Sequence, residues 1–445
     1  AYTLAWQTFL ASRRLDEAWR VAAAAVRQRP QDTVWMERLA QVGEWSGRAA
    51  QSLPLWQELA RLATLSRDAA LQQRALAGVQ RLAPGLNDDE ALLATWREVA
   101  QLRRLGDDEV LGLVAMTERL GRPEEGLVWL REAQRRQASS RLLQAEADLD
   151  ERMGEMPAAI DALRRLAARD GMTPARSARL ATLLALRADP QAAFEAMQPL
   201  AARVPPDDIA WWRLMGSLAW TLQRETEARQ ALAIVTARED FDATEADRQI
   251  QLLRESDPGA AAAFAERAWR RLKLDGYLLT ALDLRWERRD LAGMEALFAA
   301  VDGEALQRLD RESYFWMLRA QWRQARGELL AAVADMRRAL DAAPDHVGTR
   351  TAFLFLLVES GGRGELQRLL GTWLEEAQAD PAYDAACAAG YVELDLPRRA
   401  LPFWRRQAPL HRDDALWNAA YADVLDAAGQ GAAGQAVDRK STRLN

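Results

Sequence analysis

The stretch from Trp316 to Pro344, WMLRAQWRQARGELLAAVADMRRALDAAP, decides the fold of this chain of 445 residues. Small residues such as Ala320 and Ala332 recur at helical spacing on both sides of a turn at Gly327. Small side chains allow two antiparallel helices to approach closely, and bulky ones fill the space to the next unit. Proline fits after a helix because it has no amide hydrogen with which to continue one. The stretch therefore predicts a helix, a turn and a second helix.

The same pattern recurs along the chain with a period of about 34 residues. In each copy a turn with Gly, Asp or Pro precedes an anchor, usually a small residue, and further apolar residues follow it. The anchors are Ala18, Ser52, Ala91, Gly126, Ala159, Ala193, Ala228, Ala262, Met294, Ala332, Leu366 and Ala400. A thirteenth half-unit begins at Trp417. A dozen copies in phase predict a stack, because no single helix pair can bury its apolar face alone.

These positions resemble the tetratricopeptide repeat, whose first helix wants a large residue, Leu and a small residue, and whose second ends before Pro. The first helix is clearest at Trp212, Met215 and Ala219. Strands are not expected, because alternating runs of Val, Ile and Thr are missing. The resemblance implies an all-α fold, namely an α-α superhelix (solenoid) of about twelve tetratricopeptide-like helix-turn-helix repeats.

The rhythm of the repeats divides the chain into segments. Its expected boundaries are N-terminal repeats at 1–68, a degenerate helical region at 69–110, central repeats at 111–300 and C-terminal repeats at 301–437. Within 69–110 the stretch 84–87 interrupts the pattern, and helix pairs with longer turns are expected there. Residues 438–445 differ in composition from the rest of the chain and are interpreted as a disordered tail. A sequence-assembly artefact is favoured there over an ordinary frayed terminus. Because the chain starts at Ala1 rather than Met, we expect a fragment of a longer protein.

Composition argues against several classes of partner and site. Charged residues make up 28% of the chain and balance to a net charge of -6, whereas nucleic acid needs a concentrated basic surface. The single cysteine, Cys387, cannot form an intramolecular disulfide or a thiolate metal cage, and its alanine neighbours favour burial. No apolar run reaches the roughly 20 residues that a membrane helix needs. Any membrane contact would therefore come from segments outside this fragment.

Catalytic and cofactor-binding patterns are not found. His346 and His411 each follow a helix end, which favours exposed turn histidines over a base or metal ligand with converging partners. The pairs 207–208 and 413–414 are aspartates that precede first helices, where capping is favoured over divalent-ion binding. The glycine-rich stretch 361–364 lacks the strand and the Lys-Ser/Thr of a phosphate-binding loop. We predict no enzyme activity, no metal site and no cofactor.

The resemblance to tetratricopeptide proteins also implies a partner-binding groove lined by the first helices. Carrying the repeat phase forward places a mixed polar set of residues on that face. These are Asp148, Glu151, Arg152, Arg213, Ser217, Trp220, Gln321, Gln324, Glu393 and Asn418. Arg213 and Trp220 are the best candidates for contact, since an aromatic ring on a concave surface can stack on a sugar or receive a partner's side chain.

The last third of the chain carries a more particular resemblance. The stretches ALPFWRR (400–406) and DALWNAAYADVLDAAGQ (414–430) resemble the PelB family, the Pel exopolysaccharide export proteins of Gram-negative bacteria. The turns GEWSG (43–47) and GRPEE (121–125) are similar in style. The resemblance covers the repeat-rich periplasmic region of that family.

This resemblance implies a periplasmic, non-catalytic scaffold for protein–protein interaction, tethered to the outer membrane in the full-length protein. Such a scaffold would recruit a polysaccharide-modifying enzyme and guide the polymer to a porin, so that a protein and a polysaccharide are both expected partners. A cytoplasmic adaptor built from the same repeats, for assembly or regulation of another complex, is the alternative. A polysaccharide-modifying enzyme with scattered carboxylates is a third hypothesis, which the missing catalytic groups disfavour.

Overall fold

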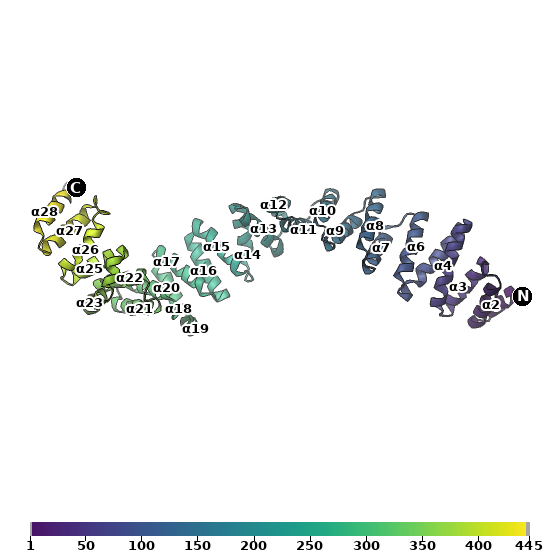
Figure 1. The fold of residues 1–445 in the computed structure, drawn as a ribbon, viewed down its shortest axis with the longest axis horizontal. Coiled ribbons are helices and arrows are strands. Elements are labelled where there is room, and N and C mark those ends of the chain that lie inside the picture. Colours follow the sequence, from purple (N-terminus) through teal and green to yellow (C-terminus); the bar gives the residue numbers. More distant parts are fainter. Residues whose placement is uncertain (1, 442–445) are drawn as a thin grey trace. The chain divides into compact units, whose positions relative to one another are not determined.

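The computed structural model describes residues 2–441, the last four by backbone alone. Over this range the chain forms 28 α-helices and three short 3-10 helices, and no strand (Figure 1). The predicted all-α fold of consecutive helical repeats is therefore confirmed. The chain divides into two compact units, Ala1–Arg224 and Glu225–Asn445, and each is described separately. No described helix has the length and apolar character needed to cross a bilayer.

In the first unit, helices that are neighbours in the sequence pack against each other in pairs (Figure 1). The helices are α1 (Tyr2–Ala11), α2 (Leu15–Gln28), α3 (Thr33–Trp45), α4 (Ala49–Ser66), α5 (Ala69–Leu82), η1 (Pro84–Leu86), α6 (Asp89–Leu102), α7 (Asp107–Arg119), α8 (Pro123–Arg136), α9 (Ser140–Arg152), α10 (Met156–Asp170), α11 (Pro174–Leu186), α12 (Pro190–Met197), η2 (Gln198–Arg203) and α13 (Ile209–Thr221). The degenerate region thus contains two helices, α5 and α6, and the turn between them is lengthened by η1, as the sequence predicts.

The second unit is built from the same kind of helix pairs, with the short helix α19 after α18 (Figure 1) and the short helix α24 after α23. Its helices are α14 (Glu225–Ala237), α15 (Ala243–Ser256), α16 (Pro258–Leu272), α17 (Asp275–Glu287), α18 (Leu291–Ala300), α19 (Gly303–Leu309), α20 (Ser313–Ala325), α21 (Leu329–Ala342), α22 (Val347–Ser360), α23 (Arg363–Thr372), α24 (Leu374–Ala379), η3 (Pro381–Tyr383), α25 (Asp384–Glu393), α26 (Pro397–Gln407), α27 (Ala415–Ala427) and α28 (Gly431–Ser441). Of the tail predicted at 438–445, α28 includes the part up to Ser441, and 442–445 lie outside the described residues.

Ten of the twelve anchors fall at the same place in their helices, whereas Ala91 is the third residue of α6 and Ala262 the fifth of α16. In α2, α4, α8, α10, α12, α14, α18, α21, α23 and α26 the anchor is the fourth residue of the helix. Every anchor except Ala91 is buried. The same position in α28 is Gly434, a buried residue that extends the series to a thirteenth member. Small size at this position matters because the facing helix is close: a Cβ on Gly126 would lie 2.7 Å from Oγ1 of Thr117 on α7.

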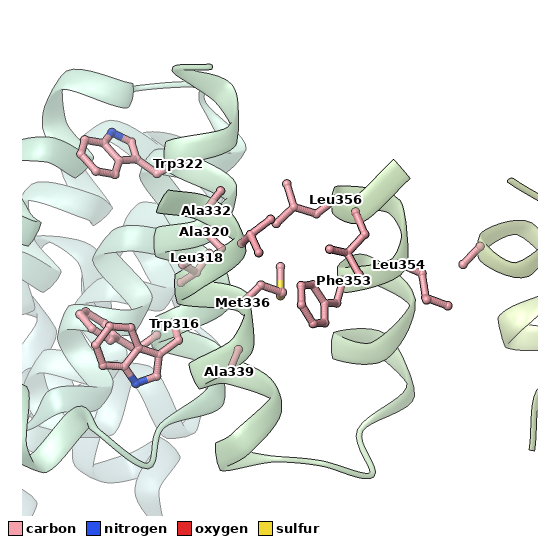
Figure 2. Close-up of a cluster of buried hydrophobic side chains, with 14 of the residues drawn as sticks. Trp316, Leu318, Ala320, Trp322, Ala332, Met336, Ala339, Phe353, Leu354 and Leu356 are labelled. Carbon is pink, nitrogen blue, oxygen red and sulfur yellow. The ribbon is translucent and has the colours of Figure 1, made fainter. Parts of the chain in front are cut away.

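Bulky side chains fill the interior between successive pairs. Met336 of α21 points toward Phe353 of α22, while Trp316 of α20 lies on the other side of α21 (Figure 2). All three are almost completely buried, at 1%, 1% and 0% exposed respectively. Each helix therefore contributes apolar contacts to the one before it and the one after it, which is how a stack of pairs forms a continuous core.

The turns within the pairs follow the chemistry expected from the sequence. Gly327, between α20 and α21, has a φ of 78°, in the left-handed region that glycine adopts at little cost. The glycines in four other turns also have positive φ: Gly47, Gly121, Gly154 and Gly361. Asp208 and Asp414 accept hydrogen bonds from the backbone amides of Trp211 and Trp417, at 3.3 and 3.0 Å. The predicted capping role of these two aspartates is therefore confirmed.

Candidate functional site

The first helices of neighbouring pairs are joined by ion pairs between residues about one repeat apart. In the first unit Arg141 of α9 lies 2.8 Å from Asp108 of α7, and Arg152 of α9 lies 2.9 Å from Glu118 of α7. The surface formed by α7, α9 and α11 is called here the first-helix face. These pairs are exposed: Arg152 and Glu118 keep 56% and 32% of their side-chain surface. Exposed pairs of this kind contribute only about 0–1 kcal/mol each.

Arg179 of α11 makes the strongest link on this face. Its Nε and Nη2 donate to the Glu151 carboxylate of α9 at 2.8 and 2.6 Å, and its Nη1 donates to Asp148 at 2.5 Å. Burial by itself would lower the pKa of Arg179, but the hydrogen bonds to Glu151 and Asp148 raise the pKa above its ordinary value. Arg179 therefore stays charged and fixes the two carboxylates in place.

A shallow depression of about 470 Å³ lies on the first-helix face. Its lining comes from all three first helices: Leu111 of α7, Arg176 of α11, and Asp148 with Arg141 of α9 among others. Positive and negative side chains both line this depression, namely Arg141, Arg176 and Asp148. The apolar side chain of Leu111 lines it as well. The surface can therefore accept a partner through a small apolar contact and charged groups of either sign.

First helices of the second unit are linked in a related way. Arg254 of α15 lies 2.9 Å from Glu287 of α17, and the Tyr314 hydroxyl of α20 donates to Asp283 of α17 at 2.5 Å. Burial and this hydrogen bond raise the pKa of Tyr314, so it stays a neutral donor. These contacts repeat the arrangement of the first-helix face with different residues.

The ten predicted groove residues belong to five helices and do not form one site. In α9, Asp148 and Glu151 contact Arg179, and Arg152 contacts Glu118. In α13, three residues are each partly buried: Arg213, Ser217 and Trp220.

The remaining predicted groove residues lie in the second unit. Gln321 of α20 is partly buried, and Gln324 of the same helix donates to Glu359 of α22. Glu393 at the end of α25 lies 3.7 Å from Arg363. Asn418 of α27 is 7% exposed, and its amide donates to the carbonyls of His411 and Asp414 at 3.1 and 2.8 Å. Asn418 therefore stabilises the turn before α27.

The arginines that organise the first-helix face are not among the residues predicted to line the groove. Arg179, Arg141 and Arg176 were not selected, although each has a carboxylate partner. A usable signal existed, because Arg141 and Asp108 are 33 residues apart and Arg179 and Asp148 are 31 apart. Opposite charges one repeat apart on first helices therefore indicate neighbours in space.

His346 and Cys387 have structural roles, the first at a helix start and the second in the core. Nδ1 of His346 accepts a hydrogen bond from the backbone amide of Thr349 at 3.2 Å, so this histidine caps α22. The predicted burial of Cys387 is confirmed: its side chain is 2% exposed, and burial raises the pKa of its thiol to about 12. Within residues 2–441, no group of three or more His, Cys, Asp or Glu side chains is arranged to hold a metal ion.

Comparison with known proteins identifies the repeat. The tetratricopeptide repeat family matches residues 165–444. A comparison with curated proteins gave no match. Among solved structures, Naa15/Naa10 bound to HypK-THB is similar at 12% identity and a TM-score of 0.41, covering 100% of this chain and 75% of that chain. A tetratricopeptide repeat protein from Parabacteroides merdae is similar at 13% identity and a TM-score of 0.31, covering 56% of this chain and 98% of that one. Because the family match spans more than half of the residues, the chain belongs to the tetratricopeptide repeat family.

Proposed function

We propose that this chain is a non-catalytic scaffold that binds protein partners on its first helices. The observation that carries the proposal is the depression of about 470 Å³ on the first-helix face, bordered by exposed ion pairs between neighbouring repeats. Because each exposed pair contributes only about 0–1 kcal/mol, a partner's charged group can replace one member at little cost. A charged partner therefore exchanges one ion pair for another, and its apolar side chains supply net affinity.

The more specific proposal is that the chain forms the periplasmic repeat region of a Pel-type exopolysaccharide export protein. Its support is the resemblance of residues 400–406 and 414–430 to the PelB family. These residues form part of α26 and include all of α27, and Trp404 and Trp417 from the two helices lie 4.8 Å apart between ring centroids. The partner is then a polysaccharide-modifying enzyme, and the polymer itself is a second candidate ligand.

Affinity for that enzyme tests the proposal. The purified chain would be immobilised, and binding of the polysaccharide-modifying enzyme of the same secretion system would be measured by biolayer interferometry. The variant R213A/W220A removes the two candidate contacts on α13 and should weaken binding at least tenfold, because aromatic and arginine side chains dominate interface energies. A control, R164A/V128A, truncates two exposed side chains on the second helices α10 and α8, outside the proposed binding surface.

Three results would count against the proposal. Unchanged affinity in R213A/W220A removes α13 from the binding surface, and no measurable binding by the natural chain removes the Pel-type assignment. If R213A/W220A loses helicity by circular dichroism, the milder variant R213Q/W220F takes its place. Robust glycan hydrolysis or deacetylation by the purified chain would contradict the non-catalytic role.

A cytoplasmic adaptor remains the second candidate function, because the repeats alone are compatible with either compartment. Affinity capture with the full chain from separated periplasmic and cytoplasmic fractions distinguishes the two. Enrichment of a polysaccharide-modifying enzyme from the periplasmic fraction supports the export scaffold. Enrichment of a defined cytosolic complex, with nothing retained from the periplasm, supports the adaptor.

A further inference from the structure

The first unit has a cavity that the first-helix face does not use. It has a volume of about 650 Å³ and lies between α8 and α10, the second helices of two neighbouring pairs, with α9 contributing to its lining. Four arginines and two carboxylates line it: Arg131, Arg135, Arg165, Arg169, Glu146 and Asp161. The six charged side chains of this lining carry a net charge of +2, and three of the arginines also pair with carboxylates just outside it, namely Asp150, Glu132 and Asp170.

Buried carboxylates hold two of the arginines in position. Glu146 is 2% exposed, and its oxygens accept from Arg131 Nε at 3.1 Å and from Arg165 Nη2 at 3.0 Å. Asp150, which is fully buried one turn further along α9, accepts from Arg131 Nη2 at 3.3 Å. Among the described residues, the other oxygen of Asp150 has no hydrogen-bond partner. Buried carboxylates therefore hold the guanidinium groups of Arg131 and Arg165, while 47% and 44% of their side-chain surface stays exposed.

The guanidinium groups keep donors for a ligand. A guanidinium carries five N–H donors, and Arg131 uses its Nε and one Nη for the buried carboxylates. Arg169 donates from Nε to the Ser140 hydroxyl at 3.0 Å, and Arg135 donates from Nη1 to Glu132 at 3.2 Å. The donors that remain come from two helices, α8 and α10, and surround the same space. Arginine in such a fork-like arrangement matches the geometry of a carboxylate.

We propose that this arginine-lined cavity binds the carboxylates of an acidic peptide segment of a partner protein. A peptide is favoured over a single small anion because the cavity is large and its arginines are divided between two helices, so that several carboxylates can be bound at once. The inference goes beyond the proposed function, since it concerns second helices and a partner chemistry that the first-helix face does not select. Binding here leaves that face free.

Binding of a fluorescein-labelled hexaglutamate peptide to the full chain, measured by fluorescence anisotropy, tests the proposal. The variant R135E/R169E reverses two arginines at the mouth and should weaken binding at least tenfold, since one charge-assisted hydrogen bond alone corresponds to about tenfold or more. The matched control R164E/R187E makes the same change of charge at two exposed arginines outside the lining, on α10 and after α11. It should bind hexaglutamate as the natural chain does.

Arg131 and Arg165 are left unchanged, because their removal would leave the buried Glu146 without its partners and threaten folding. If R135E/R169E loses helicity, R135Q/R169Q replaces it with the same expected direction. An equal loss in R164E/R187E, or equal binding of a hexaglutamine peptide, would overturn the proposal. So would inorganic phosphate that displaces hexaglutamate at a concentration equal to that of its carboxylates, because the cavity would then select a small anion.

Discussion

A methyl group added at Gly78 should destabilise the pair of helices α4 and α5, although alanine is the better helix former. Gly78 lies in the interior of α5, and a Cβ at this position would approach the buried indole of Trp56 on α4, with Cγ at 2.6 Å and Cε2 at 2.7 Å. The indole has little freedom to move: Trp56 is 1% exposed, and its Nε1 donates to the Glu44 carboxylate. The substitution Gly78→Ala therefore forces the two helices apart.

The magnitude follows from two opposing contributions. Replacing glycine by alanine inside a helix is worth about 0.5–1 kcal/mol of stability. Overfilling a packed interior costs about 1–3 kcal/mol. The net expectation for G78A is a destabilisation of about 0.5–2 kcal/mol. The matched control is G112A in α7, where no atom lies within 4 Å of the added Cβ, and a stabilisation of about 0.5–1 kcal/mol is expected.

Native-state hydrogen exchange by mass spectrometry can resolve these opposite signs in one full-length chain, because opening free energies are read helix by helix. Amides of residues 49–82 in G78A should exchange about 2- to 30-fold faster than in the natural chain, and those of 107–119 in G112A about 2- to 5-fold slower. If residues 49–82 of G78A are protected as well as, or better than, those of the natural chain, the close approach between α4 and α5 is wrong.

Three further predictions concern buried groups. Burial raises the pKa of Asp150 above its ordinary value of 3.8, so its contribution to stability is favourable at low pH and is lost as the pH rises through the raised pKa. D150N should therefore gain stability relative to the natural chain at pH 7 but not at pH 3.5, and equal urea midpoints at pH 7 would contradict this. The Cys387 thiol, buried and with a pKa raised to about 12, should react with iodoacetamide at pH 8 only after denaturant is added, and native-state labelling would refute its burial. Met336→Ala should cost about 2–5 kcal/mol and speed exchange in α21 and α22, whereas the control Leu330→Ala, at a side chain 84% exposed, should leave exchange unchanged.

The fold could be predicted because its determinant is local and repeated. An anchor such as Ala332 is the fourth residue of its helix and lies five residues after the turn glycine, Gly327. This short pattern recurs often enough to be recognised without other information. The thirteenth anchor, Gly434, was missed because the repeat signal weakens in the alanine- and glycine-rich end of the chain. In several turns a residue other than glycine takes the left-handed position. These residues, all with positive φ, are Arg13, Arg67, Ala188, Gln223, Arg289 and Asp395. These turns are hidden from a search for glycine.

The candidate site was less predictable because repeat phase gives the direction of a side chain but not its partner. Phase placed Asp148 and Glu151 on the first helices, where the structure has them, but could not show that Arg179 bridges both. It placed Asn418 on the groove face, but it could not show that the amide of Asn418 bends back to the carbonyls of its own turn. Pairing depends on side-chain conformation and on the distance between helices, and neither is encoded in a short pattern.

Because packing in each unit joins mainly helices that are neighbours in the sequence, such as α20 with α21 and α21 with α22, the route to the native state is short. Chains rich in local contacts fold quickly, since little loop-closure entropy is lost before a contact forms. A helix pair can close once about 34 residues have left the ribosome, and the next pair adds to a surface that already exists. Synthesis and folding can then proceed at the same pace, so that only the most recently made apolar face is exposed to aggregation at any moment.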